Sequence, residues 1–324
     1  MTTRRRSTRR AVRRKLLEPA EARRVLARLA AARNGVLYRP EVVAAGVPRW
    51  LVQAELRYRR WQRTGRQTVV THNGPLDDAT RRTVAVLEVG PRAALDGASA
   101  LQHLGCDIDD DGEPHAIAPK SSNPRRVKGV RVHESRRFAE SDVVVVGGVR
   151  VVRAAVAAVH AALWARTDRE ALLFPLRAVQ DRLCAPHDVL TAVLGVRRHK
   201  RRSLLLELAR DLAGGVRSMG ELDVARALRE RGLPEPDRQV VRERPDGREY
   251  LDCRYDAYWL SLEIDGIQHQ EAEQQLSDVV RDLRLVAEGD DVLRIPLTAW
   301  RLDRERVLDA LEEVFRSRGW RHAA

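Results

Sequence analysis

The segment that most restricts the fold of this chain is EYLDCRYDAYWLSLEIDGIQH, residues 249–269. Aromatic and β-branched residues alternate in part through Glu249–Tyr255 and Tyr258–Asp265, a pattern that predicts two strands. Only Asp256 and Ala257 separate these two runs. Because so short a connection leaves little freedom, we expect the strands to pair as a hairpin.

Three carboxylates should lie close together in this hairpin. The tight connection brings Asp252 within a residue or two of direct opposition to Glu263. Asp265 follows two residues later and therefore belongs to the same face as Glu263. Crowded acids repel one another unless a hard cation or a proton neutralises them. Gly266 and His269 come next, at a strand end where functional groups are commonly displayed.

The acids predict a site for Mg²⁺ or Mn²⁺, with Asp252, Glu263 and Asp265 as ligands, of the kind found in metal-dependent phosphodiesterases. The alternative is a solvated sheet face, which is the commoner environment for carboxylates on strands. The glycine directly after the acids favours the metal site, because it indicates a sharp bend or a close backbone approach.

The rest of the C-terminal part predicts a mixed sheet with helices packed on it. The expected elements are the helix Leu222–Arg231, the strand Gln239–Arg244, a helix over 276–286, a short buried strand Val292–Pro296 and a helix over 307–315. Ser218 and Glu221 have the S-x-x-E spacing of a capping box. Glu221 is therefore either a helix cap or a further acid of the site.

Residues 218–320 resemble the Vsr-like endonuclease domains, which belong to the PD-(D/E)xK nuclease class. The resemblance depends on three stretches, SMGELDVARALRERGLPEPDRQ, YLDCRYDAYWLSLEIDGIQH and SDVVRDLRLVAEGDDVLRIP. It implies a restriction-endonuclease-like mixed sheet flanked by helices. It also implies a catalytic set, in which the acids hold the metal and the histidine lies near the attacked phosphate: Asp252, Glu263, Asp265, His269 and Glu221.

One departure from the nuclease pattern concerns charge. The parent pattern has a lysine two residues after the glutamate, where it positions water or stabilises negative charge. This chain has Asp265 at that position. Vsr-like domains also commonly lack the lysine, so cleavage would depend on the cation and on His269 as general base.

The composition favours a polyanionic partner. The 324 residues carry a net charge of +13, and the sequence pI is near 10.6. Cys106, Cys184 and Cys253 show neither zinc-site spacing nor a disulfide framework, as expected in a reducing cytoplasm. No apolar run reaches transmembrane length, so we expect a cytoplasmic protein without membrane contact.

The N-terminal part predicts a DNA-binding module behind a basic arm. Residues 1–18 indicate a disordered arm that either grips phosphates or keeps the chain soluble. A helix Glu21–Arg33, a short helix Pro40–Ala45, a glycine turn and a helix Arg49–Arg59 follow, then a β-wing Trp61–Thr71. This order is typical of a winged helix-turn-helix. The candidate DNA-contacting residues are Arg49, Gln53, Arg57, Arg60 and Arg66.

The stretch GVLYRPEVVAAGVPRWLVQAELRYRRWQRTGRQTVV resembles the N-terminal domain of AbiEi-type antitoxins. That resemblance implies operator binding, a cognate toxin as protein partner and a place in toxin–antitoxin or phage-defence systems. Winged helices also serve as protein-contact modules, but the basic residues favour DNA. A homodimer is compatible with this pattern.

The central region carries no catalytic motif and predicts alternating helices and strands. Residues 143–152 predict one strand, whose first half is apolar enough to be buried. The basic run at residues 197–202 either touches nucleic acid or forms an exposed linker. The acidic run at residues 107–111 lacks the spacing of a calcium loop and indicates a solvated loop.

The chain therefore predicts an α/β, multidomain α+β protein in four parts: a basic arm at 1–18, a winged helix-turn-helix at 19–75, a central α/β domain at 76–214 and a Vsr-like domain at 215–324. Two functions remain open. One is a metal-dependent DNA endonuclease or nickase in defence, restriction or repair. The other is a non-catalytic antitoxin-type regulator that binds operator DNA.

Overall fold

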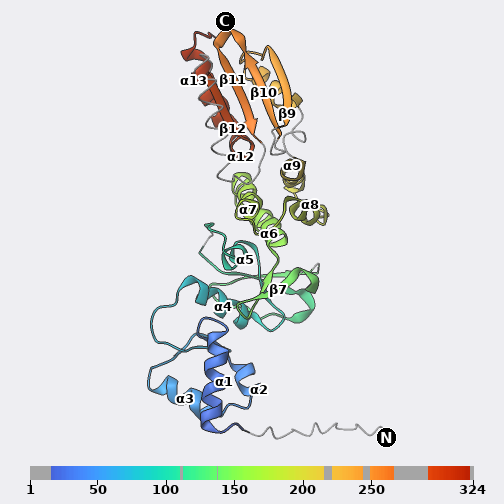
Figure 1. The fold of residues 1–324 in the computed structure, drawn as a ribbon. Coiled ribbons are helices and arrows are strands. Elements are labelled where there is room, and N and C mark those ends of the chain that lie inside the picture. The colour runs from blue at the N-terminus through green and yellow to red at the C-terminus, as the bar shows by residue number, and fades with distance from the viewer. Residues whose placement is uncertain are drawn as a thin grey trace, which may run out of the picture. The chain divides into compact units, whose positions relative to one another are not determined.

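The computed structural model describes residues 16–109, 112–136, 138–214, 221–243, 249–265 and 291–321. Within these ranges it is a mixed α/β protein whose strands form three sheets (Figure 1). Contacts divide the chain into two compact units, Met1–Leu95 with Asp111–Val152 and Asp96–Asp110 with Arg153–Ala324. The four-part division expected from the sequence stays a prediction.

The first unit begins with helices and a small sheet. The helices are α1 (Pro19–Ala31), α2 (Arg39–Ala44) and α3 (Arg49–Arg57). The strands β1 (Val36–Tyr38), β2 (Gln62–Arg63) and β3 (Thr68–Val70) form an antiparallel sheet in the order β1-β3-β2. Apolar residues of all these helices and of β1 and β3 meet in one core. The predicted helices here are confirmed, whereas β1 was not predicted.

A second, five-stranded sheet completes this unit. Its strands are β4 (Ala94–Leu95), β5 (His115–Pro119), β6 (Arg131–Ser135), β7 (Val143–Val146) and β8 (Val149–Val152), in the order β6-β5-β4-β8-β7. Helix α4 (Asp78–Val89) contacts strands of both sheets. Asp77 begins α4 by accepting a hydrogen bond from the backbone N–H of Thr80 at 2.7 Å.

The prediction of one continuous strand over 143–152 is wrong. The segment is a hairpin, because Gly147 and Gly148 take φ values of +53° and +69° and turn the chain back. The expectation that residues 143–146 are buried is also wrong. β7 lies at the sheet edge, and Val145 is 66% exposed.

The second unit contains a helical layer. Its helices are α5 (Gly97–His103), α6 (Ala154–Trp164), α7 (Asp168–Gln180), α8 (Pro186–Leu194) and α9 (Arg202–Gly214). Helix α6 buries alanines along most of its length, and small side chains allow α5, α7 and α8 to pack closely around it. No disulfide links Cys106, Cys184 and Cys253, all of which the structure describes.

The basic run at 197–202 is not simply an exposed linker. Arg201 is 4% exposed, and its guanidinium donates to the carbonyl of Ala165 at 2.7 Å. It also contacts the carbonyls of Ala162 and Leu163 and pairs with Asp168 at 2.8 Å. Arg201 therefore satisfies carbonyl groups that the last turn of α6 leaves without helical partners.

The C-terminal part of the second unit contains the third sheet. Its strands are β9 (Arg238–Glu243), β10 (Glu249–Tyr255), β11 (Leu260–Asp265) and β12 (Asp291–Pro296), in the order β12-β11-β10-β9. β9, β10 and β11 are antiparallel neighbours, and β12 joins β11 in parallel. The predicted mixed sheet is confirmed. β12 is an edge strand whose residues 292–295 are half-buried rather than buried.

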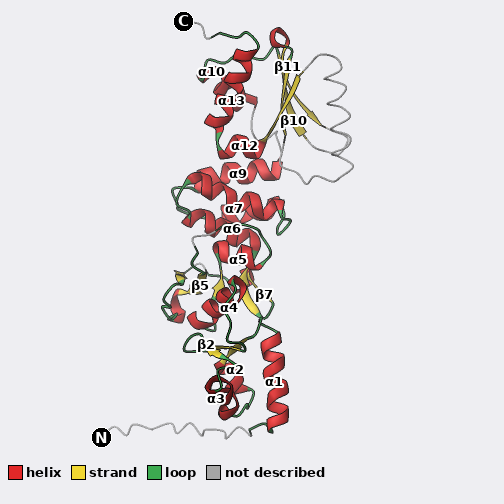
Figure 2. Cartoon of the chain, turned by 90° about the vertical axis from the view of Figure 1, so that its left-hand side faces the viewer, coloured by secondary structure: helices red, strands yellow, loops and turns green. Residues whose placement is uncertain are grey.

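Helices α10 (Glu221–Glu230), α12 (Leu297–Leu302) and α13 (Arg304–Ser317) accompany this sheet. Figure 2 shows α10 and α13 on one side of the strands. Phe315 of α13 is fully buried and meets the rings of Tyr255 and Tyr258 edge-on, with centroids 4.9 and 5.4 Å away. This face of the sheet is therefore its hydrophobic core, and the polar residues must occupy the other face.

Some predicted features lie outside the described residues. They are the basic arm at 1–15, the capping position Ser218 and the helix over 276–286. In the part of the chain that the structure does describe, no helix combines the length and the apolarity needed to cross a membrane.

Arg201→Ala should lower the free energy of unfolding by about 2–3 kcal/mol, because buried carbonyls lose their donor and an exposed Asp168 loses its partner. Arg198→Ala is the matched control, since Arg198 is an exposed arginine of the same run. Urea unfolding followed by circular dichroism measures both. Equal effects of the two substitutions would contradict the structural role of Arg201.

Candidate functional site

The backbone brings two of the predicted acids directly opposite each other. In the antiparallel β10–β11 pair, Asp252 is the partner of Glu263. Position 265 lies two residues along β11, so it belongs to the same face of the sheet as position 263. Leu260 and Leu262, of the opposite parity, belong to the hydrophobic core. The three acidic positions therefore converge on the face away from that core.

Glu263 is a buried carboxylate with a defined cationic partner. It is 1% exposed, and its Oε2 lies 3.2 Å from Nε of Arg294. Arg294 is the direct neighbour of Glu263 across the parallel β11–β12 pair. A charge this deeply buried requires a nearby opposite charge or several hydrogen-bond donors. Arg294 meets that requirement from the adjacent strand, and sequence reasoning missed it.

A second arginine carries charge on the same face. Arg254 of β10 donates to Oγ of Ser261 at 3.0 Å and to Oδ1 of Asp256 at 2.9 Å. Its position has the same parity as that of Asp252. Positive side chains therefore accompany the acids of this face, which lowers the mutual repulsion that the sequence predicted.

The remaining predicted catalytic residues are described only in part. Glu221 is the first residue of α10, but the positions of its side chain and of those of Asp252 and Asp265 are not described. His269 lies outside the described residues. Among the described residues, no group of three or more His, Cys, Asp or Glu side chains gathers as metal ligands would. Aspartate and glutamate, the residue types at the three acidic positions, provide the oxygen ligands that Mg²⁺ prefers.

A second candidate surface lies on α3. Arg49, Gln53 and Arg57 recur at intervals of four on this helix, and all three are exposed. Trp50 is 53% exposed and Tyr58, just past the helix end, is 68% exposed. Sequence reasoning did not include these aromatics, although aromatic residues among arginines are a signal of nucleic-acid contact.

Arg60 differs from the other predicted DNA-contacting residues. It lies beyond the end of α3, and its guanidinium contacts both carboxylate oxygens of Glu55 at 2.5 and 2.9 Å. The hydrogen bond from Arg60 lowers the pKa of Glu55, and the same bond raises the pKa of Arg60. Arg60 also lies over the Tyr58 ring at 5.1 Å. Its charge is therefore already engaged within the protein.

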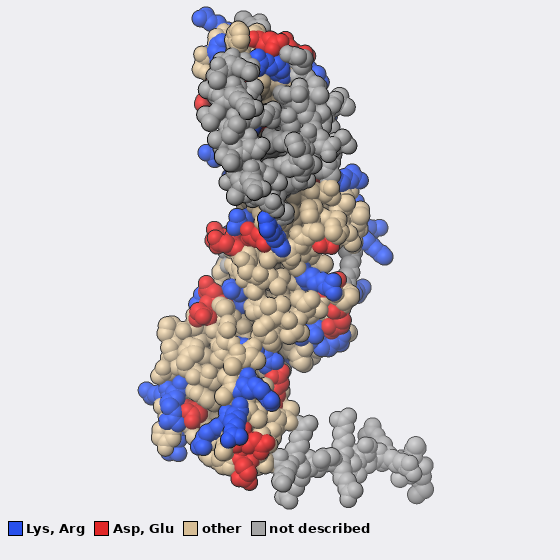
Figure 3. Space-filling view, in the orientation of Figure 1, with Lys and Arg blue, Asp and Glu red and all other residues tan. Residues whose placement is uncertain are grey.

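Arg66 lies in the turn between β2 and β3 with an exposed side chain. Arg63, at the end of β2, is exposed as well and was not among the predicted contacts. Figure 3 shows that basic side chains near the N-terminal end of the described chain are interleaved with acidic ones on the face in view. The exposed arginines of α3 and of the β2–β3 turn therefore lie in a part of the surface that carries both signs of charge.

No protein-family model and no curated protein matches the chain.

Arg294→Ala should lower the free energy of unfolding by about 3–5 kcal/mol, because the buried carboxylate of Glu263 loses its guanidinium partner. The double variant Arg294→Ala with Glu263→Gln should regain part of this loss, since it removes the charge as well. Urea unfolding of the single and double variants measures the coupling. Arg316→Ala is the control, because Arg316 pairs with Glu312 on the surface and should cost under about 1 kcal/mol.

Proposed function

We propose that this protein binds DNA through α3 and the β2–β3 hairpin and hydrolyses DNA phosphodiester bonds at the acidic face of its C-terminal sheet. The observation that carries the proposal is the direct opposition of Asp252 and Glu263, with Asp265 two residues along the same strand. In this proposal the N-terminal part is a winged helix related to those of AbiEi-type antitoxins, and the C-terminal part is a Vsr-like endonuclease domain.

The DNA-binding half is supported by the surface chemistry of α3. Arg49 and Arg57 provide guanidinium groups for phosphates or guanine edges, and Gln53 between them suits an adenine edge. Trp50 adds an exposed ring next to these groups. In this arrangement α3 is the helix that enters the major groove, and the β2–β3 hairpin contacts the adjacent backbone.

The catalytic half is supported by the ligand types. Asp252, Glu263 and Asp265 would hold Mg²⁺ or Mn²⁺, which supplies a polarised phosphate and an activated water when it is bound. Arg294 lies 3.2 Å from Oε2 of Glu263 and would hold this carboxylate in place beside the cation. His269 is the proposed general base, and Glu221 is either a further acid or the cap of α10.

A specific observation favours the second candidate function, a DNA-binding regulator without cleavage. The carboxylate of Glu263 is already paired with Arg294, so the charge of the site is partly balanced without a metal. In that case the C-terminal sheet is structural, the protein binds operator DNA and a cognate toxin is its protein partner.

Purified protein should nick supercoiled plasmid when Mg²⁺ or Mn²⁺ is present and not in excess chelator. Asp252→Asn and Glu263→Gln should each lower the nicking rate on the order of 100-fold or more, because each removes a metal-binding charge. Glu313→Gln is the control, since Glu313 is an exposed acid of α13 outside the site. Agarose gels resolve supercoiled from nicked plasmid.

Nicking that survives both acid substitutions would rule out the proposed site. DNA binding without nicking under either ion would leave the regulator as the function. Urea unfolding followed by circular dichroism is the check that both acid variants remain folded.

Arg57→Ala should weaken DNA binding and reduce the slope of log affinity against log salt concentration by about 1, as expected for one lost phosphate contact. Arg60→Ala should leave that slope unchanged, because the guanidinium of Arg60 is engaged with Glu55. Fluorescence anisotropy of a short labelled duplex at several salt concentrations measures both slopes. A larger loss of slope for Arg60→Ala than for Arg57→Ala would contradict this assignment of the contacts.

A further inference from the structure

A buried carboxylate holds the turn of the β2–β3 hairpin. Glu88, in the last turn of α4, is 5% exposed. Its Oε1 accepts hydrogen bonds from the backbone N–H of Gln67 at 2.6 Å and from Oγ1 of Thr68 at 2.7 Å. Its Oε2 accepts from the backbone N–H of Arg66 at 3.1 Å. Successive N–H groups that converge on one anion form a backbone nest, and here the anion is supplied by the protein itself.

Gly65 allows this close approach. A Cβ atom at position 65 would lie 2.3 Å from Cδ of Glu88 and 2.4 Å from Oε1, far inside contact distance. Only glycine can therefore occupy the position while the carboxylate remains in place. The glycine of the hairpin turn and the glutamate of α4, which are 23 positions apart in the sequence (88 − 65), depend on each other.

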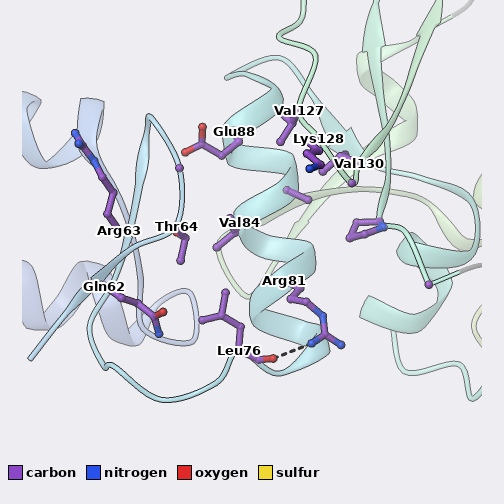
Figure 4. Close-up of a pocket in the computed structure, with 15 residues that line it drawn as sticks. Gln62, Arg63, Thr64, Leu76, Arg81, Val84, Glu88, Val127, Lys128 and Val130 are labelled. Atoms are coloured by element: carbon purple, nitrogen blue, oxygen red, sulfur yellow. Dashed lines mark hydrogen bonds between the residues drawn. The ribbon is translucent and has the colours of Figure 1, made fainter. Parts of the chain in front are cut away.

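The hairpin turn is otherwise poorly packed on this side. One hollow of about 440 Å³ lies between residues 62–65, α4 and residues 127–130, and Glu88 is part of its lining (Figure 4). A second hollow, also about 440 Å³, is lined by Gly65, Arg66, Glu88 and residues 125–127. Glu88 and Gly65 belong to both. The hydrogen bonds of Glu88 thus connect the turn to α4 at a place where side chains fill the space incompletely.

The other edge of the turn is held by Arg39 at the start of α2. Its Nη1 donates to the carbonyl of Arg66 at 2.8 Å, and its backbone N–H donates to the carbonyl of Gln67 at 2.7 Å. The N–H groups of the turn therefore face Glu88, and carbonyls of the same two residues face Arg39. With its backbone held on both sides, the turn leaves the side chain of Arg66 exposed.

We propose that Glu88 is a positioning residue for nucleic-acid binding, which orders the β2–β3 turn so that Arg63 and Arg66 meet a DNA phosphate backbone. The proposal rests on the DNA-binding half of the proposed function and not on cleavage. Among the described residues, no carboxylate pairs with the side chain of Arg63 or Arg66. Ordering the turn before binding reduces the conformational entropy lost when these arginines contact phosphate.

The test measures salt-dependent DNA binding of the full chain. Glu88→Ala should weaken binding of a short labelled duplex about three- to tenfold at moderate salt and reduce the salt slope by about 1–2, because mobile arginines form fewer phosphate contacts. Arg66→Ala should reduce the slope by about 1. The double variant Glu88→Ala with Arg66→Ala should bind no more weakly than whichever single variant has the lower affinity, since both substitutions act on the same contact.

Glu21→Gln is the matched control for net charge, because Glu21 is an exposed acid on α1. Thr68→Val is the milder variant, since it removes one donor to Glu88 and little volume; it should give a smaller change of slope in the same direction. Thr68→Val therefore still tests the proposal where Glu88→Ala folds poorly.

An unchanged slope for Glu88→Ala and Thr68→Val would overturn the proposal, because a purely structural role lowers the amount of active protein and not the number of phosphate contacts. Additive losses in the double variant would overturn it as well. Absence of DNA binding by the unaltered protein would instead refute the DNA-binding function on which the proposal rests. A third outcome is that Arg49→Ala and Arg57→Ala bind DNA normally while Glu88→Ala reduces the slope of log affinity against log salt concentration. This result would support the proposal and place the DNA contact at the hairpin alone.

Discussion

Burial of carboxylates is the physical constraint on which much of this structure depends. Removing an ionised acid from water costs several kcal/mol unless donors or a cation replace the water. Glu88 receives three hydrogen bonds from one turn, Glu263 receives the guanidinium of Arg294, and Asp96 receives Nδ1 of His160 at 2.7 Å and its neighbour's N–H. Asp211, 1% exposed, meets Nε of Arg301 at 2.6 Å. Each buried acid joins segments distant in sequence, so these contacts restrict how the elements can pack.

Local patterns predicted the elements because they depend on neighbouring residues. Local sequence patterns predicted α1, α3, α10 and α13, and alternation predicted β10 and β11. The opposition of Asp252 and Glu263 across the hairpin could also be predicted from the sequence. A connection of a few residues fixes the register of a hairpin, and the register then decides which side chains face each other.

Contacts between distant residues were not predictable in this way. Nothing local to Glu88 indicates that its carboxylate meets a turn about twenty residues earlier. Arg201 looked like one more exposed cation of a basic run, yet it is buried at the end of α6. Gly147 and Gly148 did carry a signal, because two adjacent glycines inside a valine run are typical of a hairpin turn. The valines on both sides of the glycines have strong strand propensity, but the two glycines divide them into β7 and β8.

The parallel pairing of β12 with β11 decides how the acidic face can work. It sets Arg294 beside Glu263, whereas the nuclease pattern would carry its positive charge two residues further along β11, at the position of Asp265. The guanidinium engages one oxygen of a carboxylate that the proposed metal site would also need. The same pairing lowers the net negative charge available to attract a divalent ion. Competition between Arg294 and a metal ion for the carboxylate of Glu263 is therefore what would separate the proposed cleaving sheet from a purely structural one.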